Sequence, residues 1–203
     1  MSNTIRFYGD SRSGNCFKLK LACAELEIDY DWEEVDILAG ETRTPEFLAR
    51  NANGKIPLAE LPDGRYLAES NAILSYLADG TPLGGTDRWA RAEILQWLFF
   101  EQYSHEPNIA TSRFIIRYLG NPPDRQAALA EKQSAGYRAL DVMERRLDDR
   151  AYFVGEAFTI ADIGLFAYTH VADEGGFSLD GYPGIRRWIE RIRGRERFVS
   201  MTS

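Results

Sequence analysis

Small polar side chains gather in residues 9–15, directly before a stretch with helical periodicity. Ser11, Ser13 and Asn15 supply two hydroxyls and an amide there, and Cys16 follows in the first turn of the predicted helix. A helix N-terminus presents unpaired backbone N–H groups and a partial positive charge, so it favours an anion, including a thiolate. The segment could therefore stabilise a thiolate. Serine and asparagine are also the preferred helix caps, and on the local sequence a capping role is the better interpretation.

Two dipeptides, Ile56-Pro57 and Glu69-Ser70, could hold a small peptide. A cis bond at Pro57 would turn the Ile56 backbone outward, with its N–H and C=O available to an extended ligand. Judged alone, a trans proline at the entry to a strand is the better interpretation. Glu69 could bind an ammonium group and Ser70 a carboxylate at the start of a helix. A capping serine preceded by a solvated glutamate explains the second pair about as well.

The chain has two cysteines, Cys16 and Cys23. A thiol in the first turn of a helix can become a reactive thiolate, although a half-buried structural cysteine is the more common case. Cys23 is expected to serve packing. On one helix the two residues would lie roughly 10 Å apart, which is too far for a disulfide. Two free thiols are typical of a reducing compartment, and we expect a cytoplasmic protein.

Composition excludes several classes of protein. The 203 residues carry a net charge of −7, whereas nucleic-acid binding usually needs a basic surface. No apolar run approaches the roughly 20 residues of a membrane helix, and the N-terminus lacks the apolar stretch of a signal peptide. The two histidines lie in no cluster with ligand spacing, so we predict no metal site. Residues 1–79 carry eight basic and fourteen acidic side chains, whereas residues 80–203 carry sixteen and seventeen.

The first 79 residues have the pattern of a βαβαββα unit. Pro62-Asp63-Gly64 supplies the turn of an antiparallel hairpin, and Ser70 is expected to cap the helix that follows it. The predicted strands are 5–8, 30–35, 58–61 and 65–68, and the predicted helices are 15–26, one that starts at Pro45, and one behind Ser70.

Residues 80–87 are rich in Gly, Pro and Thr, as a linker between domains would be. The rest of the chain, residues 88–203, shows only helical periodicity. We expect helices over 88–119, 124–147, 160–172 and 185–192. Thr159 followed three residues later by Asp162 predicts a capping box before the third of these. Six arginines between 186 and 197 are best explained as a solvated helix face rather than an anion site.

Taken together, in this order and ahead of a helical domain, these features resemble the cytosolic glutathione transferases, in particular their serine-using and bacterial branches. The markers are YGDSRSGNCFKLKLA at 8–22, NGKIPLAELPDGRYLAESNAILSYLA at 53–78 and FTIADIGLFAY at 158–168. The resemblance covers essentially the whole chain. It implies a thioredoxin-like N-terminal α/β domain that binds glutathione, an all-helical C-terminal domain that shapes the electrophile pocket, and a homodimer.

The same resemblance assigns roles to individual residues. It implies that Pro57 is cis, that the Ile56 backbone clamps the cysteinyl part of glutathione, and that Glu69 and Ser70 hold the γ-glutamyl end. Lys55 becomes a partner for a glutathione carboxylate. Ser13 is our choice for the hydroxyl that hydrogen-bonds the glutathione sulfur, with Ser11, Asn15 and Cys16 as alternatives. Tyr8 lies near the position of the catalytic tyrosine in other branches. Four residues are expected at the second-substrate pocket: Phe100, Tyr103, Ser104 and Arg113.

The predicted function is therefore a glutathione transferase, which activates the glutathione thiol as a thiolate for attack on a small hydrophobic electrophile. Glutathione is a co-substrate, and no tightly bound cofactor is expected. One alternative is a glutathione-dependent disulfide reductase, in which Cys16 could take part. A second alternative is a transferase-like module that binds a ligand or partner without catalysis.

Overall fold

Four strands of the N-terminal region form one mixed sheet in the order β2-β1-β3-β4. The central strand β1 pairs in parallel with β2 and antiparallel with β3, and β3 pairs antiparallel with β4. The computed structural model describes residues 4–201 of the chain. The strands are β1 (Ile5–Gly9), β2 (Tyr30–Glu34), β3 (Leu58–Glu60) and β4 (Tyr66–Ala68).

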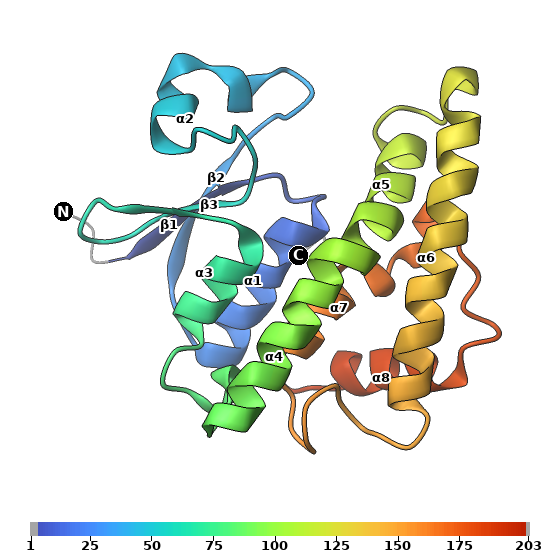
Figure 1. The fold of residues 1–203 in the computed structure, drawn as a ribbon. Coiled ribbons are helices and arrows are strands. Elements are labelled where there is room, and N and C mark those ends of the chain that lie inside the picture. Colours follow the sequence, from blue (N-terminus) through green and yellow to red (C-terminus); the bar gives the residue numbers. More distant parts are fainter. Residues whose placement is uncertain (1–3, 202–203) are drawn as a thin grey trace. The chain divides into compact units, whose positions relative to one another are not determined.

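Helices cover both faces of this sheet. Helices α1 (Gly14–Leu26) and α3 (Ser70–Leu77) pack against each other on one face, and α2 (Pro45–Arg50) lies over the other (Figure 1). Thr44 caps α2, because its Oγ1 accepts the Phe47 N–H at 3.3 Å. The predicted βαβαββα order and the Pro62-Asp63-Gly64 hairpin are confirmed.

All regular elements in the described residues 80–196 are helical, as predicted. The expected helix over 88–119 is in three parts, because a π-helical segment, Glu101–His105, separates α4 from α5. A π-helical segment adds a residue to the turn and rotates the side chains that follow, so a regular period cannot locate it. The helices are α4 (Arg88–Phe100), α5 (Glu106–Arg117), α6 (Gln126–Leu147), α7 (Ile160–Thr169) and α8 (Pro183–Arg193).

The predicted capping box at the start of α7 is confirmed. The Thr159 hydroxyl accepts the Ala161 N–H at 3.3 Å, and the Asp162 carboxylate accepts the Thr159 N–H at 3.0 Å. Asp162 is fully buried and also accepts the indole N–H of Trp188 at 2.9 Å. One carboxylate therefore caps the start of α7 and holds α8 against it.

The chain divides into two units, one running to Asp79 and the other from Gly80 to Glu196. Residues 197–201 belong with the first unit, where Arg197 forms an ion pair with Glu27 at 2.7 Å. The assignments 1–79, 80–87 and 88–203 stay predictions. Among residues 4–201, no helix has the length and apolar character needed to cross a membrane.

Candidate functional site

Ser13 is the N-cap residue of α1. Its backbone is extended, its carbonyl accepts the Phe17 N–H at 2.9 Å, and its own N–H donates to the Asp10 carbonyl at 2.9 Å. Its side chain is half-buried and accepts no capping hydrogen bond from the helix. The hydroxyl is therefore not used in the way that the local sequence favoured, and it lies where unpaired helix N–H groups create a positive potential.

A buried carboxylate fixes the loop before Ser13. Asp10 is 1% exposed and accepts three hydrogen bonds from Arg12: from its backbone N–H at 2.8 Å, from Nε at 3.0 Å and from Nη2 at 3.0 Å. The Asp10 carbonyl in turn holds the Ser13 N–H. A loop anchored through both its side chains and its backbone places Ser13 with little freedom.

Ser11 is committed to another partner. Its N–H and its hydroxyl donate to the two carboxylate oxygens of Glu34, each at 2.8 Å, and the Trp32 indole N–H donates to the same carboxylate at 2.7 Å. Burial alone would raise the pKa of Glu34, but these hydrogen bonds outweigh it, so the pKa is lowered. The Ser11 hydroxyl therefore tethers the loop to β2.

A chain of hydrogen bonds joins the N-terminal ends of α1 and α3. Ser70 Oγ donates to Asn15 Oδ1 at 3.3 Å, and Lys18 Nζ donates to Ser70 Oγ and to Asn71 Oδ1, each at 3.2 Å. The sequence analysis missed Lys18, which is fully buried. Its position three residues after Asn15 and four before Ala22 puts it on the inward stripe of α1, and that was the available signal.

Both cysteines are buried free thiols. Burial raises the pKa of Cys16 to about 12, although a hydrogen bond with the Ser13 side chain acts in the opposite direction. Burial likewise raises the pKa of Cys23 to about 12. A buried thiol with a raised pKa holds very little thiolate at neutral pH, and this argues against Cys16 as a nucleophile.

Tyr8 is also a core residue rather than a site residue. It is 3% exposed within a cluster that includes Val35, Phe47 and Leu58, and its hydroxyl donates to Glu60 at 2.5 Å. Burial, followed by the Glu60 hydrogen bond, raises the pKa of Tyr8 to about 12. A phenol held in this way is a poor activator of a bound thiol.

The Ile56-Pro57 peptide bond is cis, so the trans bond favoured by the local sequence is wrong and the geometry implied by the family resemblance is present. The backbone of Ile56 forms no hydrogen bond to another residue in the described part of the chain. The preceding Lys55 side chain is exposed, and its carbonyl accepts from Asn51 Nδ2 at 2.7 Å.

Helix α3 starts one residue earlier than a Ser70 cap would place it. Glu69 holds the N-cap position and Ser70 is the first helical residue, so the predicted cap is wrong. Glu69 has φ +70°, a region that costs a non-glycine residue about 1 kcal/mol or more. Its side chain is exposed, whereas Ser70 is 5% exposed.

Three of the four residues predicted at the second-substrate pocket line one hollow in the second unit. This hollow has a volume of about 290 Å³, and Phe100, Tyr103 and Ser104 border it together with Asn108 and side chains of α6. Arg113 does not line it. The Arg113 guanidinium is buried and forms an ion pair with Glu174 at 2.7 Å, so it fastens α5 to the segment after α7.

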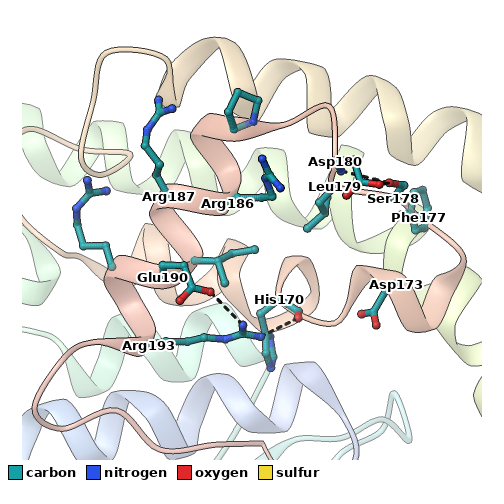
Figure 2. A pocket seen from close by; sticks show the side chains of 13 residues that line it. His170, Asp173, Phe177, Ser178, Leu179, Asp180, Arg186, Arg187, Glu190 and Arg193 are labelled. Atoms are coloured by element: carbon teal, nitrogen blue, oxygen red, sulfur yellow. Dashed lines mark hydrogen bonds and ion pairs between the residues drawn. The ribbon is translucent and has the colours of Figure 1, made fainter.

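A larger hollow in the second unit, about 1160 Å³, contains no residue predicted at the site. His170 and arginines of α8 line it (Figure 2). Arg187 and Arg191 donate to backbone carbonyls, and Arg193 pairs with Glu190 at 3.4 Å. Asp173, Asp180 and Glu190 also line the hollow, so its acidic groups offset much of the arginine charge. A largely balanced, solvated surface is the interpretation that fits these contacts.

Comparisons with known proteins find a matching family model for each of the two units. Residues 12–79 match the family model described as Glutathione S-transferase, N-terminal domain, and residues 95–196 match Glutathione S-transferase, C-terminal domain. The chain is similar to a glutathione S-transferase crystal structure from Pseudomonas fluorescens, at 53% identity over 98% of this chain and 99% of that one, with a TM-score of 0.96.

Two further relatives bear on the chemistry. The Disulfide-bond oxidoreductase YfcG of Escherichia coli is 32% identical over 89% of this chain and 86% of its own length. A glutathione transferase structure from Pseudomonas putida, described with one glutathione disulfide bound per subunit, is 26% identical. It covers 96% of this chain and 89% of its own, with a TM-score of 0.83.

His170, in the larger hollow, predicts a pH-dependent stability. Its Nδ1 hydrogen-bonds the Phe166 carbonyl at 2.9 Å, and burial, reinforced by Arg193, lowers its pKa to about 4. The unfolded chain therefore takes up a proton before the folded chain does, and stability present above about pH 6.5 is lost as the pH falls toward 4. Glutamine does not titrate, so His170→Gln should lose less stability than the wild type as the pH falls. We expect the difference to reach about 2 kcal/mol, less than the full pKa shift would give, because the ring is partly exposed to solvent.

Urea unfolding of both proteins at several pH values between 4 and 7 measures this effect. Comparing the two chains cancels the contributions of all other titrating groups. Parallel stability curves for the wild type and the variant would contradict the prediction.

Proposed function

Because this chain belongs to the glutathione S-transferase family, we propose that it binds glutathione in its first unit and activates the thiol for attack on a small hydrophobic electrophile. The observation that carries the proposal is the Ser13 hydroxyl, which is held at the N-terminus of α1 but not spent on capping it. Two buried free cysteines are in keeping with work in the cytoplasm.

Glutathione would lie along the edge formed by the cis proline and the two helix N-termini. In this arrangement, the Ile56 N–H and C=O pair with the cysteinyl part of the ligand. Glu69 takes the γ-glutamyl ammonium, and Ser70 takes the carboxylate with its backbone N–H and hydroxyl. The exposed Lys55 binds the carboxylate at the other end. The Lys55 and Glu69 side chains are exposed, whereas the nearly buried Ser70 hydroxyl would have to exchange its bond to Asn15 for one to the ligand.

The chemistry then follows from electrostatics. A hydrogen bond from the Ser13 hydroxyl to the glutathione sulfur, together with the helix N-terminus, favours the charged thiolate and lowers the pKa of the bound thiol. The thiolate attacks the electrophilic carbon and forms a thioether, and the leaving group departs with the bonding electron pair. Phe100, Tyr103 and Ser104 border the site for that electrophile. A hollow of about 290 Å³ suits a small molecule rather than a large one.

Ser13→Ala tests the central assignment. We expect kcat/KM for conjugation of an aryl halide to fall about 100-fold, as it does when one preorganised donor to a reacting anion is removed. The pKa of the bound thiol, followed by thiolate absorbance, should rise with it. Thermal stability should change little, because the hydroxyl makes no capping bond.

Two variants make the comparison specific. Ser11→Ala should cost much less activity, since that hydroxyl is committed to Glu34. If Ser13→Ala kept its conjugation activity and Asn15→Ala lost it, the catalytic role would belong to Asn15. Absence of glutathione binding by the wild type would overturn the proposal. Binding without turnover would favour the non-catalytic module.

Disulfide reduction is the second candidate, favoured by the similarity to the Escherichia coli oxidoreductase. In this reaction the glutathione thiolate attacks a substrate disulfide, forms a mixed disulfide and releases a thiolate. A second glutathione then attacks the mixed disulfide, which yields glutathione disulfide and a second substrate thiol. The burial and raised pKa of Cys16 support glutathione, not the protein, as the source of both thiols.

Cys16→Ala therefore should keep the disulfide reductase activity within about twofold of the wild type, because a thiol with a strongly raised pKa supplies almost no nucleophile. The assay couples glutathione disulfide formation to its reduction. If Cys16→Ala lost reductase activity but kept conjugation activity and its melting temperature, Cys16 would be shown to take part in disulfide reduction.

A homodimer completes the proposal. Helix α4 and the π-helical segment expose Leu95, Phe99 and Tyr103 at spacings of four residues, with 69% of Phe99 and 88% of Tyr103 accessible. Contiguous apolar surface of this kind marks interaction sites. We expect sedimentation to give about twice the 23.0 kDa chain mass. Phe99→Asp should shift the population to monomers. Leu119→Asp, which changes an exposed apolar residue elsewhere in the second unit, should not. A monomeric wild type would contradict this part.

A further inference from the structure

We propose that Lys18 is a positioning residue for the γ-glutamyl carboxylate of glutathione, acting through Ser70. The inference rests on the proposed function, because it concerns how that function's ligand is held. Among the basic side chains that the structure describes in the first unit, Lys18 alone is fully buried. A buried ammonium therefore lies behind Ser70, out of reach of the ligand itself.

The contacts around Ser70 decide what its hydroxyl can do. Lys18 Nζ donates to Ser70 Oγ at 3.2 Å, and an ammonium has donors but no acceptor. The Ser70 hydrogen must therefore point away from Lys18, and it points to Asn15 Oδ1 at 3.3 Å. Lys18 thus makes Ser70 a donor at the N-terminus of α3.

The bond from Ser70 to Asn15 is long enough to be exchanged. A hydroxyl bonded to a carboxylate is typically 2.5–2.7 Å from it and about twice as strong as a bond between neutral groups. An arriving carboxylate would take over the Ser70 hydrogen while Lys18 continues to donate to the same oxygen. Successive hydrogen bonds polarise one another, so the ammonium strengthens the donor that meets the ligand.

Charge gives Lys18 a second effect. The first 79 residues contain fourteen acidic and eight basic side chains, a balance that disfavours an anionic ligand. Solvent screens the exposed charges, whereas a buried cation is screened much less. Asn71 Oδ1 also accepts from Lys18 Nζ at 3.2 Å, so the ammonium is held between Ser70 and Asn71 at the start of α3. The buried cation therefore offsets the acidic surface where a carboxylate would bind.

Lys18→Met removes the charge and keeps a side chain of similar length. Lys20→Met is the matched control: it removes the same charge from the same helix, and Lys20 lies over the Trp32 ring instead of beside Ser70. We expect Lys18→Met to raise KM for glutathione roughly ten- to a hundredfold, with kcat at saturation within about twofold, and Lys20→Met to change neither.

A second ligand separates positioning from a general effect on the fold. With glutathione whose γ-glutamyl carboxylate is converted to an amide, the ratio of Kd between Lys18→Met and the wild type should fall to near one. An equal loss for both ligands would mean that Lys18 only maintains the structure. If Lys18→Met does not fold, Lys18→Gln, which keeps an N–H donor without charge, enters the same comparison.

The outcomes distinguish this inference from the proposed function. Equal glutathione affinity in the wild type, Lys18→Met and Lys20→Met overturns the inference and leaves the proposed function standing. A wild type that binds neither glutathione nor its amide overturns both. Weakened binding of glutathione alone, restricted to the Lys18 variants, is the supporting result.

Discussion

To perform the proposed function, the first unit has to bind a negatively charged tripeptide although its own net charge is negative, and the rest of the proposed site depends on how it does so. The structure brings the N-terminal ends of α1 and α3 together and joins them by hydrogen bonds from Ser70 to Asn15 and from Lys18 to Ser70. Two helix N-termini and one buried ammonium concentrate positive potential at one place. The net charge of the unit therefore says little about the potential that a ligand meets.

The sheet explains why the remaining groups reach the same edge. Because β1 is central, its C-terminal end meets the start of α1 on one side and β3 on the other. Tyr8 lies opposite Leu58, the first residue of β3, so Pro57 and Ile56, which precede β3 in the chain, lie immediately beyond the end of that ladder. The loop fixed by Asp10 and Arg12 then places Ser13 at the same end of β1. Topology, rather than any single contact, assembles the site.

Sequence patterns were sufficient for elements with a clear period or turn chemistry, such as the Pro62-Asp63-Gly64 hairpin and the Thr159 and Asp162 capping box. They failed where a side chain's partner lies far along the chain. The helical spacing of Lys18 indicates that it faces inward, but nothing local identifies its partner Ser70, 52 residues away. The predicted cap at Ser70 and the predicted pocket role of Arg113 were wrong for a related reason. The positive φ of Glu69 and the ion pair of Arg113 with Glu174 both depend on tertiary structure. Local propensity likewise favoured a trans Pro57, and tertiary structure decided otherwise.

The burial of both cysteines bears on where the reactive thiol comes from. With the pKa of Cys16 and of Cys23 raised to about 12, the protein contributes almost no thiolate of its own at neutral pH. Conjugation and disulfide reduction then begin with the same activated glutathione. They differ only in whether its thiolate attacks a carbon atom or a sulfur atom of the second substrate. The first unit would serve both reactions equally well. The choice between them therefore rests with the residues proposed to admit the second substrate, which include Phe100, Tyr103 and Ser104.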